Sequence, residues 1–208
     1  MGNDKYTQRS YDFEMRAAPE EEGVIEGRPI VFESKTNMVY FDEIIHRGAL
    51  DKTNLKDVRF LINHNKNMVP LARSRNNNEN STMRLMPDKD GLKIRLKLDI
   101  VNNTDARSLY SAIQRGDITG MSFLFSINGE EWENFESDHP TRHIRDIGKV
   151  LEVSAVTFPA YEETEISARA KDELESLRAL ESARSKATPD GDKALLELQK
   201  LKNHNRKY

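Results

Sequence analysis

Serine and histidine are the residue types most able to carry chemistry in this sequence, because the chain contains no cysteine. A nucleophile would have to be Ser, Thr, Lys or a carboxylate, and a serine nucleophile needs a base that accepts its proton near neutral pH. The chain has 14 serines and five histidines, so their presence alone identifies no pair. The histidines are His46, His64, His139, His143 and His204. Local context has to select among them.

Ser122 has the most unusual surroundings of the serines, in the segment Gly120-Met121-Ser122-Phe123-Leu124-Phe125. On a strand, Ser122 shares a face with Gly120 and Leu124, and the missing glycine side chain leaves room for a substrate backbone. The alternative is a small core serine bonded to a backbone carbonyl. No Gly-x-Ser-x-Gly motif is present, which disfavours an α/β-hydrolase.

His64 ends an apolar strand-like segment, 59–65, and a strand end is a rigid place from which to present a base. The alternative is a histidine that merely caps the strand. His139 and His143 flank Pro140 in the polar stretch 134–145, which we expect to be a loop. A metal site on that pair has little support, since no further ligand follows at a usual spacing.

Glu152 interrupts the apolar run 151–161, together with Ser154 and Thr157. A carboxylate inside a β segment is costly to bury unless it has a cationic or hydrogen-bonding partner. Orienting a histidine would provide such a partner. The alternative is a glutamate on the exposed face of a strand.

The composition divides the chain into three parts. We expect a mobile N-terminal arm over 1–22, a β-rich body over 23–169 and a helical tail over 170–208. The predicted strands are 24–32, 39–44, 58–63, 83–86, 92–100, 120–127 and 150–158, with 83–86 and 92–100 paired as a hairpin. A helix capped by Thr104 and stopped by Gly116 interrupts them. The tail pattern predicts two short amphipathic helices with a break at 188–191. The fold class is therefore mainly β with flanking helices, an α+β protein.

Charge and hydropathy exclude several classes of protein. The 208 residues carry a formal net charge of −3, so no general attraction to phosphate backbones is expected and nucleic acid is not a predicted partner. No apolar run approaches the roughly 20 residues of a membrane span, and the N-terminus lacks a signal-peptide layout. We therefore expect no membrane association and a cytosolic location, or work inside a cytosolic assembly.

The ordered set of motifs resembles the prohead proteases of tailed bacteriophages, the serine peptidases of capsid maturation. The matching segments are Glu26-Gly27, Val31-Phe32, 41–45, 48–50, 57–65, 70–73, Gly91-Leu92, 115–123 and 151–161. The resemblance covers about residues 9–169. The family is similar in fold to the herpesvirus assembly proteases, which implies a β-barrel ringed by helices. Leu71-Ala72-Arg73 departs from the family's more usual Leu-Gly-Arg, which affects only the local turn.

The resemblance implies a nucleophile at Ser122 and a base at His64. Its third catalytic member falls on Glu152, with His143 as the second candidate, because the herpesvirus proteases use a histidine there. It implies no metal and no cofactor. The implied substrates are the scaffolding segment of the major capsid protein or a separate scaffold protein, and the protease itself. The implied location is inside the phage prohead, in the host cytoplasm, and a homodimer is left open.

Two other functions compete with this interpretation. A catalytically silent capsid-assembly or scaffolding factor explains the helical tail, but leaves His64 and Ser122 as coincidences. A nucleic-acid-binding barrel needs aromatic residues interleaved with Lys and Arg, whereas Tyr40 and Phe41 stand beside Asp42 and Glu43. The tail itself is either a solvated segment or an element that targets the protease to the scaffold and is removed by self-cleavage.

Overall fold

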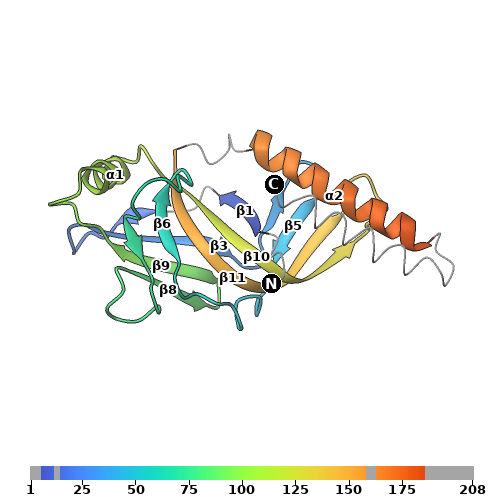
Figure 1. Cartoon of the computed structure of the whole chain (residues 1–208), viewed down its shortest axis with the longest axis horizontal. Coiled ribbons are helices and arrows are strands. Elements are labelled where there is room, and N and C mark those ends of the chain that lie inside the picture. Colours follow the sequence, from blue (N-terminus) through green and yellow to red (C-terminus); the bar gives the residue numbers. More distant parts are fainter. Residues whose placement is uncertain (1–5, 12–14, 158–162, 186–208) are drawn as a thin grey trace.

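Strands dominate the part of the chain that the computed structural model describes, which comprises residues 6–11, 15–157 and 163–185. Along the chain the elements are β1 (Tyr6–Tyr11), β2 (Arg16–Ala17), β3 (Val24–Val31), β4 (Lys35–Asn37), β5 (Asp42–Ile45), β6 (Arg59–Ile62), β7 (Ala72–Arg73), β8 (Met83–Asp88), β9 (Gly91–Lys97), α1 (Thr104–Arg115), β10 (Gly120–Glu133), β11 (Thr141–Val156) and α2 (Glu163–Ser185). The helices α1 and α2 lie toward opposite ends of the molecule (Figure 1). This arrangement agrees with the α+β class expected from the sequence.

A long antiparallel hairpin, β10 and β11, forms the centre of the larger, seven-stranded sheet. β1 pairs with β10, while β11 pairs in parallel with β5 near its start and with β6 near its end. β4 and β7 complete this sheet beside β5 and β6, and the smaller sheet has the order β2-β3-β9-β8. Three segments that are distant in sequence, β1, β6 and the end of β11, therefore meet around the first residues of β10.

Alternation along β10 and β11 separates a core face from the opposite face of the sheet. Successive side chains of a strand point to opposite sides. The buried side chains that join the hydrophobic core are Met121, Phe123 and Phe125 of β10 and Ile144, Ile147, Val150, Val153 and Ala155 of β11. Ser122, Glu152 and Ser154 occupy the alternate positions and are also buried. The period of two therefore collects these polar side chains on one face.

The structure confirms the predicted strands, with ends that differ by a few residues in most cases. The largest differences are in the β10–β11 hairpin, where β10 continues to Glu133 and β11 already begins at Thr141. The prediction of a loop over 134–145 is therefore wrong for His143, which lies on β11. Backbone pairing and the burial of Ile144 and Ile147 extend this hairpin, although most of its other residues are polar.

The predicted helix is confirmed as α1, although its cap lies one residue earlier than expected. The Asn103 side chain accepts hydrogen bonds from the N–H groups of Asp105 and Ala106, at 3.0 and 3.1 Å. Asn103, and not Thr104, is therefore the N-cap. Gly116 ends the helix with φ of 78°, a left-handed conformation that glycine adopts without steric cost.

The N-terminal segment differs from the expected arm over 1–22. Tyr6–Tyr11 form the edge strand β1, and Arg16–Ala17 form β2. Four consecutive polar residues, 7–10, form the middle of β1, so the sequence lacks the apolar period that identifies a strand. Pairing with the unoccupied edge of β10 and the burial of Arg9 place this segment in the sheet.

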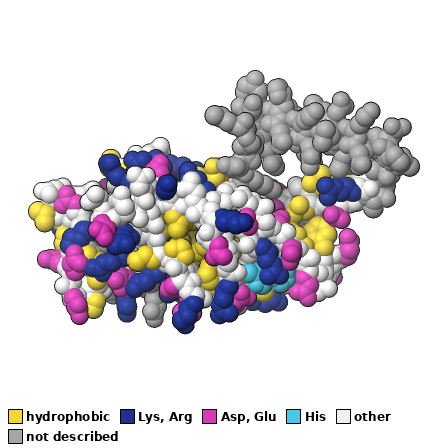
Figure 2. Space-filling view, turned by 90° about the horizontal axis from the view of Figure 1, so that it is seen from below, with side chains coloured by type: hydrophobic (Ala, Val, Ile, Leu, Met, Phe, Trp, Pro, Cys, Tyr) yellow, Lys and Arg dark blue, Asp and Glu magenta, His cyan; other side chains and the backbone are white. Residues whose placement is uncertain are grey.

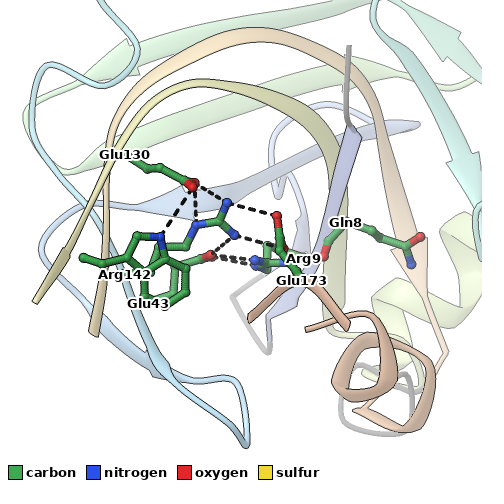
Figure 3. A network of polar contacts seen from close by, with 7 residues as sticks. Gln8, Arg9, Glu43, Glu130, Arg142 and Glu173 are labelled. Carbon is green, nitrogen blue, oxygen red and sulfur yellow. Dashed lines mark hydrogen bonds and ion pairs between the residues drawn. The ribbon is translucent and has the colours of Figure 1, made fainter. Parts of the chain in front are cut away.

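A buried network of charges joins β1, β5, β10, β11 and α2 (Figure 3). Arg9 donates to both carboxylate oxygens of Glu43 at 2.6 Å. Arg142 lies 3.5 Å from the same carboxylate through Nη1, and it donates to Glu130 at 2.7 Å and to Glu173 of α2 at 3.2 Å. The Arg142 and Glu43 side chains are almost fully buried. Opposite charges from five elements are thus paired, and Arg9, Glu43 and Arg142 at the centre of the network are shielded from water.

The C-terminal helix α2 begins before the boundary that the sequence suggests, since it runs from Glu163 across residue 169. Ala170 and Leu174 are buried, and Ala170 packs with Met38 and Phe41. The break at 188–191 and the second predicted helix lie outside the described residues. The division of the chain at 169 and 170 stays a prediction, but α2 packs on the body from Ala170 onward.

Both sheets are open: within the described ranges, no strand pairing closes either of them on itself. The herpesvirus-protease-like barrel therefore stays a prediction. On the face shown in Figure 2, Lys and Arg side chains are interspersed with Asp and Glu and form no continuous basic stripe. Neither α1 nor α2, the helices of the described segments, combines the length and apolar character of a membrane span.

Candidate active site

Ser122 lies near the start of β10, inside the larger sheet. Its backbone is opposite Ser10 of β1 on one side and opposite Ser154 of β11 on the other. The residue is completely buried by its surroundings. Because neighbouring strands flank it on both sides, the sheet fixes where its hydroxyl points.

His64 follows β6 and is aimed by two consecutive residues with a left-handed backbone. The φ angles of Asn63 and His64 are 47° and 54°, values that are uncommon for residues other than glycine. The Asn63 N–H donates to the Ala155 carbonyl at 2.9 Å, and the Thr157 N–H donates to Asn63 Oδ1 at 2.9 Å. The end of β6 is thus fastened to β11, which brings the imidazole to Ser122.

Ser122, His64 and Glu152 form a continuous series of polar contacts. His64 Nε2 lies 2.6 Å from Ser122 Oγ, and His64 Nδ1 lies 2.8 Å from Glu152 Oε1. The His64 and Glu152 side chains are 12% and 6% exposed. The structure therefore brings together the three residues that the sequence analysis selected. In this geometry the imidazole can take a proton from the serine while the carboxylate stabilises the imidazolium.

The Ser122 hydroxyl has a second acceptor on β1. Its Oγ donates to the Arg9 carbonyl oxygen at 2.8 Å, but a hydroxyl has one proton and can donate to either Arg9 or His64. When the proton points to Arg9, His64 Nε2 has to be the donor of its contact with Ser122 Oγ. A general base needs the other arrangement. The β1 carbonyl therefore competes with His64 for the serine proton.

Ser154 is a fourth polar residue of this site, and the sequence analysis gave it no role. It is completely buried, accepts a hydrogen bond from the His64 N–H at 3.1 Å and donates one to Glu152 Oε1. The signal available in the sequence was the spacing Glu-x-Ser, because residues two apart on a strand share a face. That spacing alone is too common to identify a site.

His143, the second candidate for the third residue, lies elsewhere. Its Nδ1 is 2.8 Å from His46 Nε2, and its Nε2 is 3.1 Å from Glu133. His143 precedes Glu152 by nine residues on β11, which corresponds to about 30 Å along a strand. The structure therefore places Glu152, and not His143, against His64.

His139 and His143 also do not form a metal site together. His139 Nε2 lies 3.1 Å from Asp42 Oδ1, a contact on the exterior of the protein. The hydrogen bond from Lys35, and to a smaller extent that from His139, lowers the pKa of Asp42 against the opposing effect of burial. Among the described residues, no cluster of three or more His, Asp or Glu side chains is arranged to bind a metal ion.

An open pocket of about 320 Å³ lies near the opposite end of β6 from His64. Asp57, Arg73, Arg75 and Asn76 line it. The Arg73 guanidinium donates to Asp57 at 2.5 Å and holds the pKa of that carboxyl below its usual value. None of the lining residues contributes to the contacts of Ser122 and His64, so the pocket is separate from the candidate active site.

A buried serine, a histidine and a carboxylate that contact one another in series are the arrangement of serine hydrolases. Comparison with protein families identifies the family to which the chain belongs, that of the caudovirus prohead serine proteases, whose model matches residues 10–178. Comparisons with curated proteins and with solved structures gave no match. Membership supports a role as a capsid maturation protease that associates with capsid proteins in the prohead, inside the host cell.

Proposed function

We propose that the chain is a serine endopeptidase in which Ser122 is the nucleophile, His64 is the general base and Glu152 orients the imidazole. The observation that carries the proposal is the contact series from Ser122 Oγ through both ring nitrogens of His64 to Glu152 Oε1. The matched family supports it, because the segment 10–178 contains all three residues. Similarity to the herpesvirus assembly proteases in fold is part of the same proposal.

The proposed reaction is acyl transfer to Ser122. Ser122 Oγ attacks the scissile carbonyl carbon while its proton passes to His64 Nε2, and the carbonyl oxygen becomes an oxyanion. The imidazolium, held by Glu152, then gives this proton to the leaving amine as the peptide bond breaks. A water molecule then attacks the acyl-enzyme. His64 takes a proton from this water and gives it to Ser122 Oγ as the ester bond breaks.

The proposed substrates are the scaffolding segment of the major capsid protein or a separate scaffold protein, and the protease itself. Cleavage inside the prohead, in the host cytoplasm, would remove internal scaffold and make space for DNA. The support for this choice is the family, whose members act on proheads of tailed phages.

Intact-mass analysis of the full chain, co-expressed with its cognate capsid protein, tests the proposal. We expect the wild type to shorten itself and the capsid protein, and we expect Ser122→Ala and His64→Gln to leave both at full length. Ser126→Ala, at another buried serine of β10, and His139→Gln, at an exposed histidine, are matched controls that should behave as the wild type.

Two results would count against the proposal. Cleavage by Ser122→Ala at the wild-type rate excludes Ser122 as the nucleophile. The wild-type chain and the capsid protein could both stay at full length while the two still assemble. A catalytically silent assembly factor would then be the better interpretation. The fragment masses from an active wild type would also give the cleavage sites.

A further inference from the structure

Ser154 connects the candidate base and the candidate orienting carboxylate through one hydroxyl. Its Oγ accepts a hydrogen bond from the backbone N–H of His64 at 3.1 Å and donates its proton to Glu152 Oε1. The same Glu152 oxygen lies 2.8 Å from His64 Nδ1. A closed ring of contacts therefore runs from the His64 backbone through Ser154 and Glu152 back to the His64 side chain.

The backbone at His64 needs such support. Two successive residues, Asn63 and His64, have a left-handed backbone, which carries a steric cost for residues with a Cβ atom. Strained backbone persists where the surrounding structure determines it. Asn63 is held by Ala155 and Thr157, whereas the contact that holds the His64 N–H is the Ser154 hydroxyl.

The position of Ser154 in the sheet also ties it to the nucleophile. Ser154 on β11 is directly opposite Ser122 on β10, and both residues are completely buried. Facing residues of antiparallel strands have Cβ atoms about 4.5–5.5 Å apart. A buried hydroxyl on this side of the sheet requires hydrogen-bond partners, and both partners of Ser154 belong to the candidate active site.

We propose that Ser154 is a positioning residue of the peptidase, which holds His64 and Glu152 in register with Ser122 through its hydroxyl. This inference rests on the proposed function. Ser154 touches neither the substrate nor the transferred proton. The Ser154 hydroxyl oxygen accepts the hydrogen bond from the His64 backbone N–H, and the hydroxyl proton is donated to the Glu152 carboxylate. The competing interpretation is a core serine whose hydrogen bonds contribute only to folding.

The test measures how fast Ser122 reacts with a fluorophosphonate, a probe that requires no knowledge of the substrate. Ser122 Oγ forms a bond to phosphorus, fluoride leaves, and His64 takes the hydroxyl proton. Intact-mass analysis of the full chain over time gives the maximal inactivation rate, kinact, and the half-saturating probe concentration, KI. Thermal unfolding of each variant shows whether the fold is retained.

Five proteins are compared: the wild type and Ser122→Ala, Ser154→Ala, Ser154→Thr and Ser126→Ala. We expect Ser154→Ala to lower kinact about 10- to 100-fold with KI unchanged, because a base misplaced by about 1 Å costs up to ~10² in rate. Ser154→Thr keeps the hydroxyl and suits a strand, so it should recover most of the rate. Ser126→Ala removes a hydroxyl from another buried serine of β10 and should react as the wild type.

The outcomes separate this inference from the proposed function. Equal labelling of the wild type and Ser122→Ala, or no labelling of the wild type, overturns the proposed function and the inference with it. If the wild type is labelled at Ser122 and Ser154→Ala reacts equally fast, the inference alone is wrong. It is also wrong if Ser154→Thr is as slow as Ser154→Ala while both unfold at the wild-type temperature, or if Ser126→Ala slows the reaction as much.

Discussion

Two residues, Glu152 and His143, are candidates for the third position of the triad. Glu152 Oε1 lies 2.8 Å from His64 Nδ1, whereas His143 contacts His46 and Glu133. A carboxylate fixes the ring with its proton on Nδ1 and stabilises the imidazolium, which an amide does not. We therefore expect Glu152→Gln to lower the rate of Ser122 labelling by about 10²–10⁴-fold.

His143→Gln is the matched control for this substitution, since it changes the other candidate and leaves the contacts of His64 intact. It should retain the wild-type labelling rate and KI. A large loss in His143→Gln together with a wild-type rate in Glu152→Gln would assign the third role to His143. Fluorophosphonate labelling followed by intact mass measures both variants under the same conditions.

Residue types and strand context make Ser122, His64 and Glu152 candidates, and the resemblance to the prohead proteases assigns their catalytic roles. Each interrupts or ends an apolar segment, where a polar group requires a reason. Ser154 could not be selected in the same way, because its role depends on the left-handed turn at Asn63 and His64. No local sequence pattern predicts that turn, which forms because β6 pairs with β11 and Asn63 is hydrogen-bonded to Thr157.

At the scale of elements, the edge strand β1 is held by a buried ion pair. Arg9 donates two hydrogen bonds of 2.6 Å to Glu43, whose side chain has no exposed surface. Arg9→Met leaves that carboxylate buried with Arg142 as its remaining cationic contact, at 3.5 Å. We expect a loss of about 3 kcal/mol in the free energy of unfolding, measured by urea denaturation.

Arg28 offers the contrasting control. It also forms two hydrogen bonds to one carboxylate, Asp88, but the two side chains are 28% and 38% exposed. Arg28→Met should therefore cost less than about 1 kcal/mol. Equal losses in both variants would show that burial does not distinguish the two pairs. Adding Glu43→Leu to Arg9→Met should recover part of the stability, because the unpaired buried charge is then absent.

The turn between β8 and β9 gives a prediction about pH. Hydrogen bonds from Arg28, supported by the N–H groups of Asp90 and Gly91, hold the pKa of Asp88 well below its usual value, against the opposing effect of burial. The folded chain therefore keeps Asp88 ionised at pH values where the unfolded chain binds a proton. The stabilising contribution is present above about pH 4 and is lost as the pH falls through the folded pKa.

Asp88→Asn should remove this dependence on pH. The difference in unfolding temperature between the wild type and Asp88→Asn should be largest near neutral pH and should shrink as the pH falls below about 4. Thermal unfolding followed by circular dichroism at several pH values measures it. A difference that stays constant over this range would mean that the asparagine costs stability through the turn geometry alone.

Elements with apolar alternation could be predicted from the sequence, and those held by charge could not. The sequence predicts β9 and β10 from their apolar residues, whereas it predicts a mobile arm where the structure has β1. The burial of Arg9 against Glu43 depends on a residue 34 positions away. The sequence also does not predict the far half of the β10–β11 hairpin, where the buried Ile144 and Ile147 stand among mostly polar residues.

At the scale of the whole molecule, one network of ion pairs connects β1, near the start of the described chain, with α2 at its end. Arg142 contacts Glu43, the partner of Arg9 on β1, and Glu173 on α2 (Figure 3). α2 also covers Met38 and Phe41 through Ala170. A protease domain that ends at residue 169 would therefore lose contacts of the folded body. The removable part of the tail should begin after α2, which ends at Ser185.

This boundary leads to a prediction about assembly. Residues 186–208 carry Leu195, Leu198 and Leu201 at helical spacing among basic residues, a pattern typical of a helix that docks on a partner. We expect a chain that ends at Ser185 to keep the unfolding temperature and the Ser122 labelling rate of the full chain. It should nevertheless be absent from proheads, since the segment proposed to bind scaffold is missing.

The measurement is the number of protease copies per prohead, obtained by mass spectrometry of sedimented particles after co-expression with the capsid protein. Ser122→Ala in both chains prevents self-cleavage from removing the tail during assembly. A chain that ends at Arg169 is the contrasting control, which should lose stability because Arg142 loses Glu173 and Phe41 loses Ala170. Equal copy numbers for the full chain and the chain ending at Ser185 would place the targeting contacts in the folded body.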